Sequence, residues 1–315
     1  MAVLLLTGRA SLAETLQEVL AVRGIPPDPQ AAGDAARPIT SYAFHDDART
    51  FLIAYYWDDA GGVLRAPLRL SRYEKGQGQW RHVTVPAAQM KGGEADCLGS
   101  VTAIHPTDNA FYLDLHLTPS AGCVLILSKD LSEALEVRAA LYGWFLAEFA
   151  DGTVVYHNSQ VHFAPTHAAE ISLYQPRSGR SVRIYPQKPY QAVRAAHIEK
   201  ARAAYSDENW CRERNHHCDP ELFDNRLLGI VEINDRTRAL AFVARFDNTV
   251  SGPDAARRGA NAPEFTEVLY VYRNVDNPEQ IEFREMVVAD FQARFGNIPL
   301  SEALEPAILR RIFGD

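Results

Sequence analysis

The sequence predicts an all-β fold made of a repeated four-stranded unit with helical additions, on three observations. Short runs rich in β-branched and aromatic residues, which are typical of strands, follow one another along the chain. Turn sequences such as Ala150-Asp151-Gly152 and Pro176-Arg177-Ser178-Gly179 separate them, because glycine takes positive φ and proline fixes φ early in a turn. Similar runs recur at intervals of roughly 40 to 50 residues, as in repeat folds.

Residues 1–37 are expected to hold one helix and a linker. Ser11-x-x-Glu14 fits a capping box, in which two free N–H groups of the first helical turn gain side-chain acceptors. A helical stripe of apolar residues follows and stops before Gly24. Its members are Leu12, Leu16, Val19 and Leu20. The alternative is the end of a secretory signal, although the segment lacks a basic start and its apolar run is short. A proline-rich linker completes the segment.

Four repeats, each with four expected strands, follow between residues 39 and 287. They cover 39–85, 97–138, 139–186 and 226–287. The first strands end in matching sequences: Ala-Phe-His-Asp, Ala-Ile-His-Pro, Glu-Phe-Ala-Asp and Glu-Ile-Asn-Asp. A helical insertion is expected at 187–225, between the third and fourth repeats, and a helical tail with a break at Pro299 follows from 288.

Four-stranded repeats of this length resemble the blades of β-propellers. The resemblance covers about residues 39–287 and is to the class, because the repeats carry no Trp-Asp blade ending and no kelch glycine pair. It implies a small propeller-like domain at 38–287, with four recognisable blades and a divergent fifth as an alternative. A stacked-sheet all-β fold is the other architecture that the pattern allows.

Composition restricts the partners and leaves the compartment open. The net charge is −8 and the chain has no run of five basic residues, which argues against nucleic acid and anionic membrane. No apolar run approaches the roughly 20 residues of a membrane span. Of the four cysteines, Cys211 and Cys218 are the favoured disulfide candidates, and Cys97 with Cys123 is a second conceivable pair. Bonded cysteines would indicate a secreted or periplasmic protein, and reduced ones a cytoplasmic protein.

The resemblance to a propeller implies that the loops after the second strands share one face, and polar residues cluster there. The catalytic candidates are His157, His116, Asp58 and Asp247. The ligand-binding candidates are Trp57, Asp59, Asn158, His162, His167 and Arg245. Histidines and carboxylates on one face are suited to a divalent metal, with His116, His157 and His162 as candidate ligands, or to general acid and base catalysis. The alternative is a polar rim of capped strand ends.

Two functions of different classes are consistent with this arrangement. One is binding of a small molecule or peptide at the loop face, with catalysis of the hydrolase or lyase type. Glycan hydrolysis is one candidate reaction, because carboxylates beside aromatic rings are suited to it. The other is a non-catalytic scaffold that recruits a protein through its rim. A deep pocket with perturbed carboxylates or histidines would favour the first function.

Overall fold

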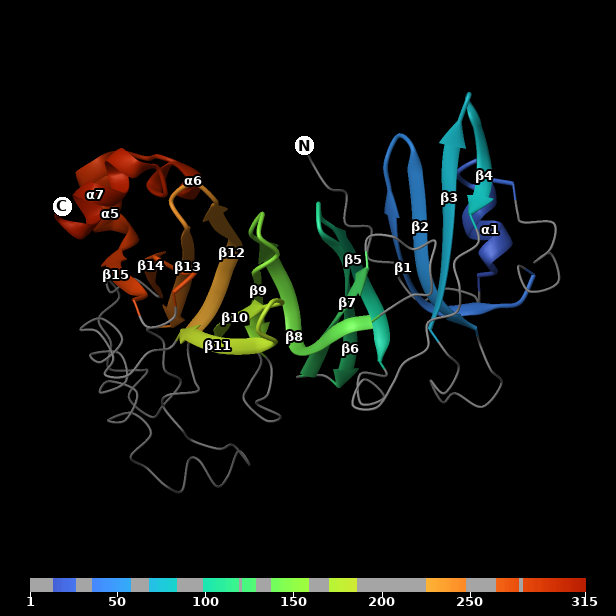
Figure 1. Cartoon of the computed structure of the whole chain (residues 1–315), viewed down its shortest axis with the longest axis horizontal. Helices are drawn as coiled ribbons and strands as arrows, with labels where there is room; N and C mark the ends of the chain where they lie inside the picture. The colour runs from blue at the N-terminus through green and yellow to red at the C-terminus, as the bar shows by residue number, and fades with distance from the viewer. Residues whose placement is uncertain are drawn as a thin grey trace, which may run out of the picture. The chain divides into compact units, whose positions relative to one another are not determined.

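The computed structural model of the chain is mostly β-sheet (Figure 1). It describes residues 14–26, 36–57, 68–83, 99–118, 121–128, 137–158, 170–185, 225–247, 265–277 and 280–315. The chain divides into two compact units, unit 1 (residues 1–145) and unit 2 (residues 146–315). No helix in these described ranges is long and apolar enough to cross a membrane.

The described residues of unit 1 form one helix and two antiparallel meanders. The helix is α1 (Leu16–Ala21), and the first meander has the strand order β1-β2-β3-β4. Its strands are β1 (Ile39–Asp46), β2 (Thr50–Trp57), β3 (Arg69–Gly76) and β4 (Gln79–Val83). The second meander consists of β5 (Ser100–Pro106), β6 (Ala110–Thr118), β7 (Ala121–Ser128) and the start of β8 (Val137–Glu148).

The described residues of unit 2 form two further meanders and three helices. The end of β8 is followed by β9 (Val154–Asn158), β10 (Ile171–Gln175) and β11 (Arg180–Tyr185). The last meander is β12 (Asn225–Asn234), β13 (Ala239–Asp247), β14 (Phe265–Arg273) and β15 (Glu282–Val287). The helices are α5 (Val288–Phe295), α6 (Leu300–Ala303) and α7 (Pro306–Phe313). Four consecutive four-stranded meanders in the described residues confirm the all-β, propeller-like fold class.

One strand boundary differs from the prediction, because β8 serves two meanders. The sequence predicts a weak strand near 135–137 and a separate strand at 141–149, but β8 is continuous from Val137 to Glu148. Its first part pairs with β7, with Leu141 opposite Val124, and β9 is its other neighbour. Gly143, in the middle of β8, has a φ of 144°, a conformation that other residues rarely adopt. Strand-forming patterns reveal strands but not a change of partner along one strand.

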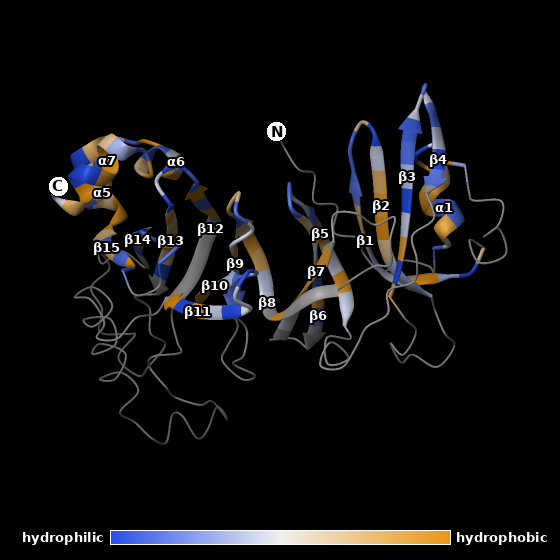
Figure 2. Ribbon diagram, in the orientation of Figure 1, coloured by the Kyte–Doolittle hydropathy of each residue, from blue (hydrophilic) through white to orange (hydrophobic). Residues whose placement is uncertain are grey.

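The two meanders of unit 1 pack face to face, and α1 covers the outer face of the first. Successive side chains of a strand point to opposite faces, and six consecutive residues of β2 are buried. Leu52, Ala54 and Tyr56 join the core shared with the second meander, whereas Phe51 and Ile53 join the core with α1. Figure 2 shows β2 as one of the apolar strands of unit 1.

The capping box of α1 lies one turn later than the sequence predicts. Thr15 is the N-cap, its side chain accepts from the backbone N–H of Glu18, and the Glu18 carboxylate accepts from the backbone N–H of Thr15. The predicted Ser11 lies outside the described residues. Because Ser-x-x-Glu and Thr-x-x-Glu both fit the motif, sequence spacing could not choose between these two consecutive boxes. The predicted stripe members Leu16, Val19 and Leu20 are buried against the sheet.

In unit 1 a helix covers the first meander, whereas in unit 2 helices cover the outer face of the last meander. Phe149, Val155 and Leu173 pack against Phe242 and Tyr270 between the two meanders. The other face of the last meander, which includes Ala241 and Val271, is covered by residues of α5 to α7, among them Phe291, Leu304 and Ile312. The first and the last meander of the described chain therefore each bury one face under helical residues.

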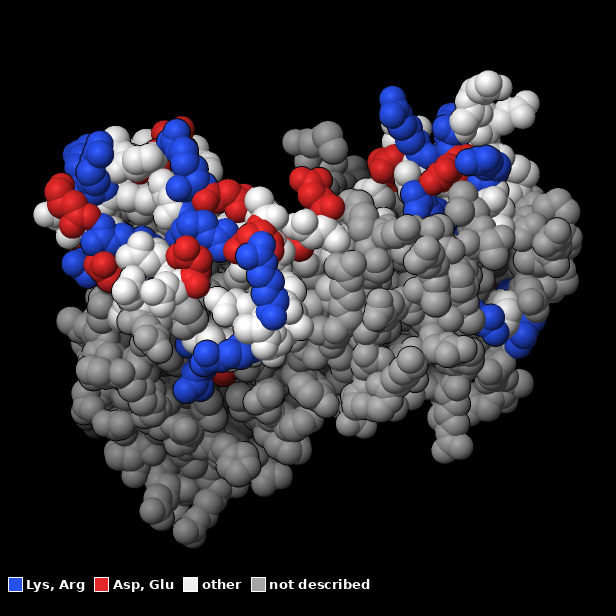
Figure 3. Space-filling model, viewed as in Figure 1, with Lys and Arg blue, Asp and Glu red and all other residues white. Residues whose placement is uncertain are grey.

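In unit 2, the first turns of the two meanders contact each other through hydrogen bonds. Arg238, with a φ of 46°, donates from Nη2 to Oδ2 of Asp151 at 2.9 Å, and Asp235 Oδ1 accepts from the Ala150 backbone N–H at 2.7 Å. The Arg238 guanidinium also lies 4.3 Å from the centroid of the Phe149 ring. Figure 3 shows acidic and basic side chains intermixed over the described part of unit 2. These contacts hold equivalent turns of the two meanders together.

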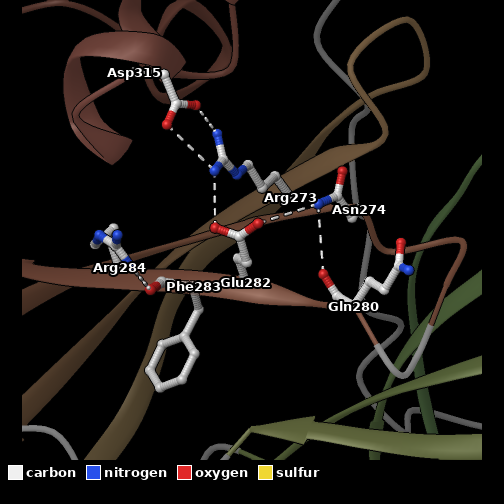
Figure 4. A network of polar contacts seen from close by, with 7 residues as sticks. All are labelled: Arg273, Asn274, Gln280, Glu282, Phe283, Arg284 and Asp315. Carbon is white, nitrogen blue, oxygen red and sulfur yellow. Dashed lines mark hydrogen bonds and ion pairs between the residues drawn. The ribbon is translucent and has the colours of Figure 1, made fainter.

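A polar network fixes the last residue of the chain to the last meander (Figure 4). Arg273 of β14 donates to Asp315 and, at 2.8 Å, to Glu282 of β15. Its guanidinium lies 4.2 Å from the centroid of the Phe313 ring. The hydrogen bond from Arg273 lowers the pKa of Asp315, and the same bond raises the pKa of Arg273.

We expect acid to release this contact. Because the pKa of Asp315 is lower in the folded chain than in the unfolded one, its stabilisation is present above the ordinary aspartate pKa and is lost as the pH falls through the lowered value. The measurement is the Tm of the parent and of Asp315→Asn across the acidic range. The parent is expected to have the higher Tm at pH about 6, and the difference should shrink as the pH falls below the ordinary aspartate pKa. A difference that is constant across this range would contradict the assignment.

Candidate functional site

The second strands β2, β6, β9 and β13 all run from the first turn of their meander to the opposite end, which we call the loop end. Trp57, Asn158 and Asp247 are the last residues of β2, β9 and β13. His116 lies near the end of β6, opposite Ser100 and Gly122, and is exposed. The predicted site residues that the structure describes thus lie at the loop ends of their own meanders.

At the loop end of unit 2, a half-buried carboxyl, that of Glu170, stands just before the strand that pairs with the predicted histidine. Ile171 of β10 pairs with His157 of β9 and with Tyr185 of β11, and Glu170 immediately precedes it. His157 is half-buried. Burial raises the pKa of the Glu170 carboxyl, and the charge of Arg183, whose Nη1 lies 3.7 Å from Oε1, opposes the rise. The Arg183 side chain is 57% exposed, so water screens this ion pair and burial dominates.

Arg245, another predicted ligand-binding residue, is held in an ion pair. Its Nη2 and Nε donate to Oε1 of Glu267 on β14, at 2.6 and 3.2 Å. The pair is partly buried and lies directly across the strands, because Arg245 and Glu267 are register partners. The guanidinium therefore has a carboxylate partner within its own meander.

At the loop end of unit 1, two guanidinium groups lie against the predicted aromatic residue. Arg37 Cζ is 4.3 Å and Arg69 Cζ is 4.5 Å from the Trp57 ring centroid. Tyr55 approaches the same ring in an edge-to-face arrangement, with 6.2 Å between centroids. Trp57 thus lies against two arginine side chains, and its part in ligand binding stays a prediction.

Several predicted site residues are not tested by the structure. Outside the described residues lie Asp58, Asp59, His162, His167, Cys211 and Cys218. The insertion expected at 187–225 is undescribed up to Asn225, where β12 begins. Among the described residues, no group of three or more His, Cys, Asp or Glu side chains could hold a metal ion. A metal site that includes His116, His157 and His162 therefore stays a prediction.

Among the described residues, the one cysteine is Cys123. It is fully buried among the apolar residues between the two meanders of unit 1. It takes part in a disulfide bond, and no second described cysteine is its partner. The sequence placed a bridge at Cys123 second to one between Cys211 and Cys218.

Sequence reasoning missed three polar residues whose surroundings in the structure are unusual for their type: Glu170, Asp114 and Arg69. Glu170 was read only as the first residue of a strand, although a carboxylate directly before an apolar run is a weak sign of a half-buried acid. Asp114 is 6% exposed and accepts from the Phe145 backbone N–H at 3.0 Å, with His105 Nε2 2.8 Å from its other oxygen. The sequence explained His105 by turn polarity alone. Arg69 carries no distinguishing signal in the sequence.

Comparison with known proteins gives neither a family nor a close relative. No family model and no curated protein matches the sequence. Among solved structures, a GH93 α-L-arabinofuranosidase of Fusarium graminearum has a TM-score of 0.34 and 8% identity, covering 79% of this chain and 66% of that one. A GH43_1 enzyme from Xanthomonas citri has a TM-score of 0.28 and 9% identity, covering 80% and 88%.

A xylan β-1,4-xylosidase from Bacillus halodurans has a TM-score of 0.28 and 11% identity, covering 78% of this chain and 41% of that one. This chain thus spans less than two thirds of the length of two of these three enzymes. At these identities and TM-scores, the similarities say nothing about substrate or reaction.

Proposed function

We propose that the protein is a hydrolase that binds a small polar molecule, a glycoside, at the loop end of unit 2, where Glu170 donates a proton to the leaving group. The observation that carries the proposal is the raised pKa of Glu170, which burial causes. Among the described carboxyl groups with a resolved pKa shift, the others shift downward: Glu18, Asp47, Asp151 and Asp315. Glu170 is therefore the described carboxyl that is best suited to hold a proton for transfer.

The surroundings of Glu170 support a role as an acid. A carboxyl with a raised pKa remains protonated at higher pH than an ordinary glutamate, and cleavage of a glycosidic bond needs such a group on the leaving oxygen. His157 lies one register position away on the neighbouring strand and is the second proton-transfer group of the proposal. Asp247, at the end of β13 in the same unit, is proposed as the second carboxylate that glycoside cleavage requires.

Replacing Glu170 with glutamine is expected to lower kcat for glycoside hydrolysis about 100-fold, because glutamine keeps the side-chain volume but cannot donate the proton. Release of 4-nitrophenol from 4-nitrophenyl α-L-arabinofuranoside and 4-nitrophenyl β-D-xyloside measures the reaction. KM is expected to change little. The parent rate should fall on the alkaline side as Glu170 loses its proton, and this limb should be absent from the residual rate of the variant.

Glu302→Gln is the matched control, because Glu302 is exposed on α6 and lies outside the proposed site. It removes the same charge and should keep the parent rate. If the parent cleaves neither glycoside, the glycosidase proposal fails and the scaffold alternative becomes the better one. If the parent is active and Glu170→Gln is equally active, the loop-end site is not where catalysis occurs.

A further inference from the structure

A β-bulge in β11 decides the face on which Arg183 lies. Ile171 of β10 pairs with Tyr185 of β11. The next pair joins Ser172 to Arg183, so Ile184 is an extra residue on β11. Ile184 and Tyr185 are both buried in the core between the two meanders of unit 2. Because side chains alternate along a strand, the extra residue turns Arg183 away from that core, to the face of Ser172.

The same face carries Glu170, the proposed proton donor. Residues two apart along a strand share a face, so Glu170 follows Ser172. Arg183 Nη1 lies 3.7 Å from Glu170 Oε1, which makes an ion pair longer than a hydrogen bond. The Arg183 side chain is 57% exposed and that of Glu170 only 18%. The guanidinium is therefore open to a ligand beside a carboxyl that is mostly shielded from water.

The proposed acid role leaves Arg183 without a charged partner in the reactive state. Glu170 can donate a proton only while it is neutral, and a neutral carboxyl does not neutralise a guanidinium. Arginine stays protonated at any working pH. Among the described carboxylates, the one paired with Arg183 is Glu170. A negatively charged group on the substrate, bound beside Glu170, would supply the missing partner.

Such a group would also help Glu170 to keep its proton. The charge of Arg183 opposes the burial that raises the pKa of Glu170. An anion on the guanidinium cancels this opposition, and its own charge disfavours ionised Glu170. Binding of an anionic substrate and protonation of the acid therefore favour each other.

We propose that the glycoside bound at the loop end of unit 2 is a uronide, whose carboxylate Arg183 binds, and this assignment rests on the proposed function of Glu170. In a β-D-glucuronide, only the anomeric carbon, the ring oxygen and C5 lie between the glycosidic oxygen and the carboxylate carbon. One sugar unit can therefore reach both side chains. A carboxylate also matches the guanidinium fork in the spacing of its oxygens. Arg183 was not among the ligand-binding residues that the sequence predicted.

Binding of free sugars tests this contact without any reaction. The probes are D-glucuronate and D-glucose, which differ by a carboxylate in place of a hydroxymethyl group, titrated calorimetrically into the full-length protein. Glucuronate is expected to bind at least about tenfold more tightly than glucose, the gain expected from one charge-assisted hydrogen bond. Arg183→Gln should lose this preference. Arg180→Gln is the matched control, because Arg180 is exposed at the opposite end of β11, and it should keep the preference.

Hydrolysis assays show whether the same contact selects the substrate. The parent is expected to cleave 4-nitrophenyl β-D-glucuronide with a kcat/KM at least about tenfold above that for 4-nitrophenyl β-D-glucoside. Arg183→Gln should remove the difference mainly by raising KM for the glucuronide, because the carboxylate is remote from the bond that breaks. Arg180→Gln should keep the parent ratio.

The two measurements separate failure of the uronide proposal from failure of the acid role of Glu170. Equal affinity of the parent and Arg183→Gln for glucuronate overturns the uronide proposal. So does an equal kcat/KM for glucuronide and glucoside in a parent whose activity is lost in Glu170→Gln, which leaves the acid role standing. Glucuronate binding that depends on Arg183, without cleavage of any glycoside, overturns the acid role and leaves the carboxylate contact.

Discussion

Replacing Phe242 with alanine is expected to lower the free energy of unfolding by about 3–5 kcal/mol, the range for a large aromatic removed from a packed core. Phe242, on β13, is fully buried between the two meanders of unit 2. Its ring is stacked with Tyr270 at 5.3 Å and Tyr272 at 5.9 Å, and meets Tyr185 edge-on at 5.2 Å. The substitution therefore removes burial and three ring contacts at once.

The surrounding rings explain why the cavity should stay open. Tyr272 donates its hydroxyl proton to the Ile184 carbonyl at 3.2 Å, which restrains it from moving into the space. The measurement is urea unfolding followed by circular dichroism, with hydrogen exchange of β13 and β14 to assign the loss to unit 2. Phe295→Ala is the matched control, because that ring is only partly buried at the end of α5. Equal losses in the two variants would show that Phe242 is not a central core residue.

The strands that the sequence located best are those with both faces buried. β2 begins and ends at the predicted residues Thr50 and Trp57, because a continuous apolar run stands between two clear turns. Likewise, β13 begins at the predicted Ala239. Burial of both faces leaves a strong local pattern, so pairing with neighbours adds little that the sequence does not already show.

Features that depend on a distant partner could not be predicted in the same way. The first part of β8 pairs with β7, and β9 is its other neighbour. This change of partner depends on which neighbouring strands have free backbone hydrogen-bonding groups, and no residue type within β8 indicates it. Ser41 has a left-handed φ of 46° at a register shift in β1, and its Oγ accepts from the Val101 backbone N–H at 2.6 Å, a contact between strands 60 residues apart. The burial of Glu170 and the donors around Trp57 likewise result from packing, so residue type alone could not single them out.

Replacing Gly122 with alanine is expected to cost about 3 kcal/mol, the upper end of the usual range for overpacking. A Cβ on Gly122 of β7 would lie 2.5 Å from Trp144 Cε2 and 2.8 Å from the Gly143 carbonyl oxygen. The indole can rotate away, but the carbonyl belongs to the backbone of β8 and cannot move without disturbing the strand. The measurement is the free energy of unfolding from urea titration.

Gly76→Ala is the matched control, because a Cβ there meets nothing within 4 Å and that glycine is also a strand residue. Its effect should stay within about 0.5 kcal/mol. In the double variant Gly122→Ala/Trp144→Leu, removal of the indole relieves one of the two clashes, so part of the loss relative to Trp144→Leu alone should disappear. Full recovery would mean that the indole, and not the backbone of β8, excludes a side chain at position 122. No loss in Gly122→Ala itself would mean that β7 and β8 can separate where β8 changes partner.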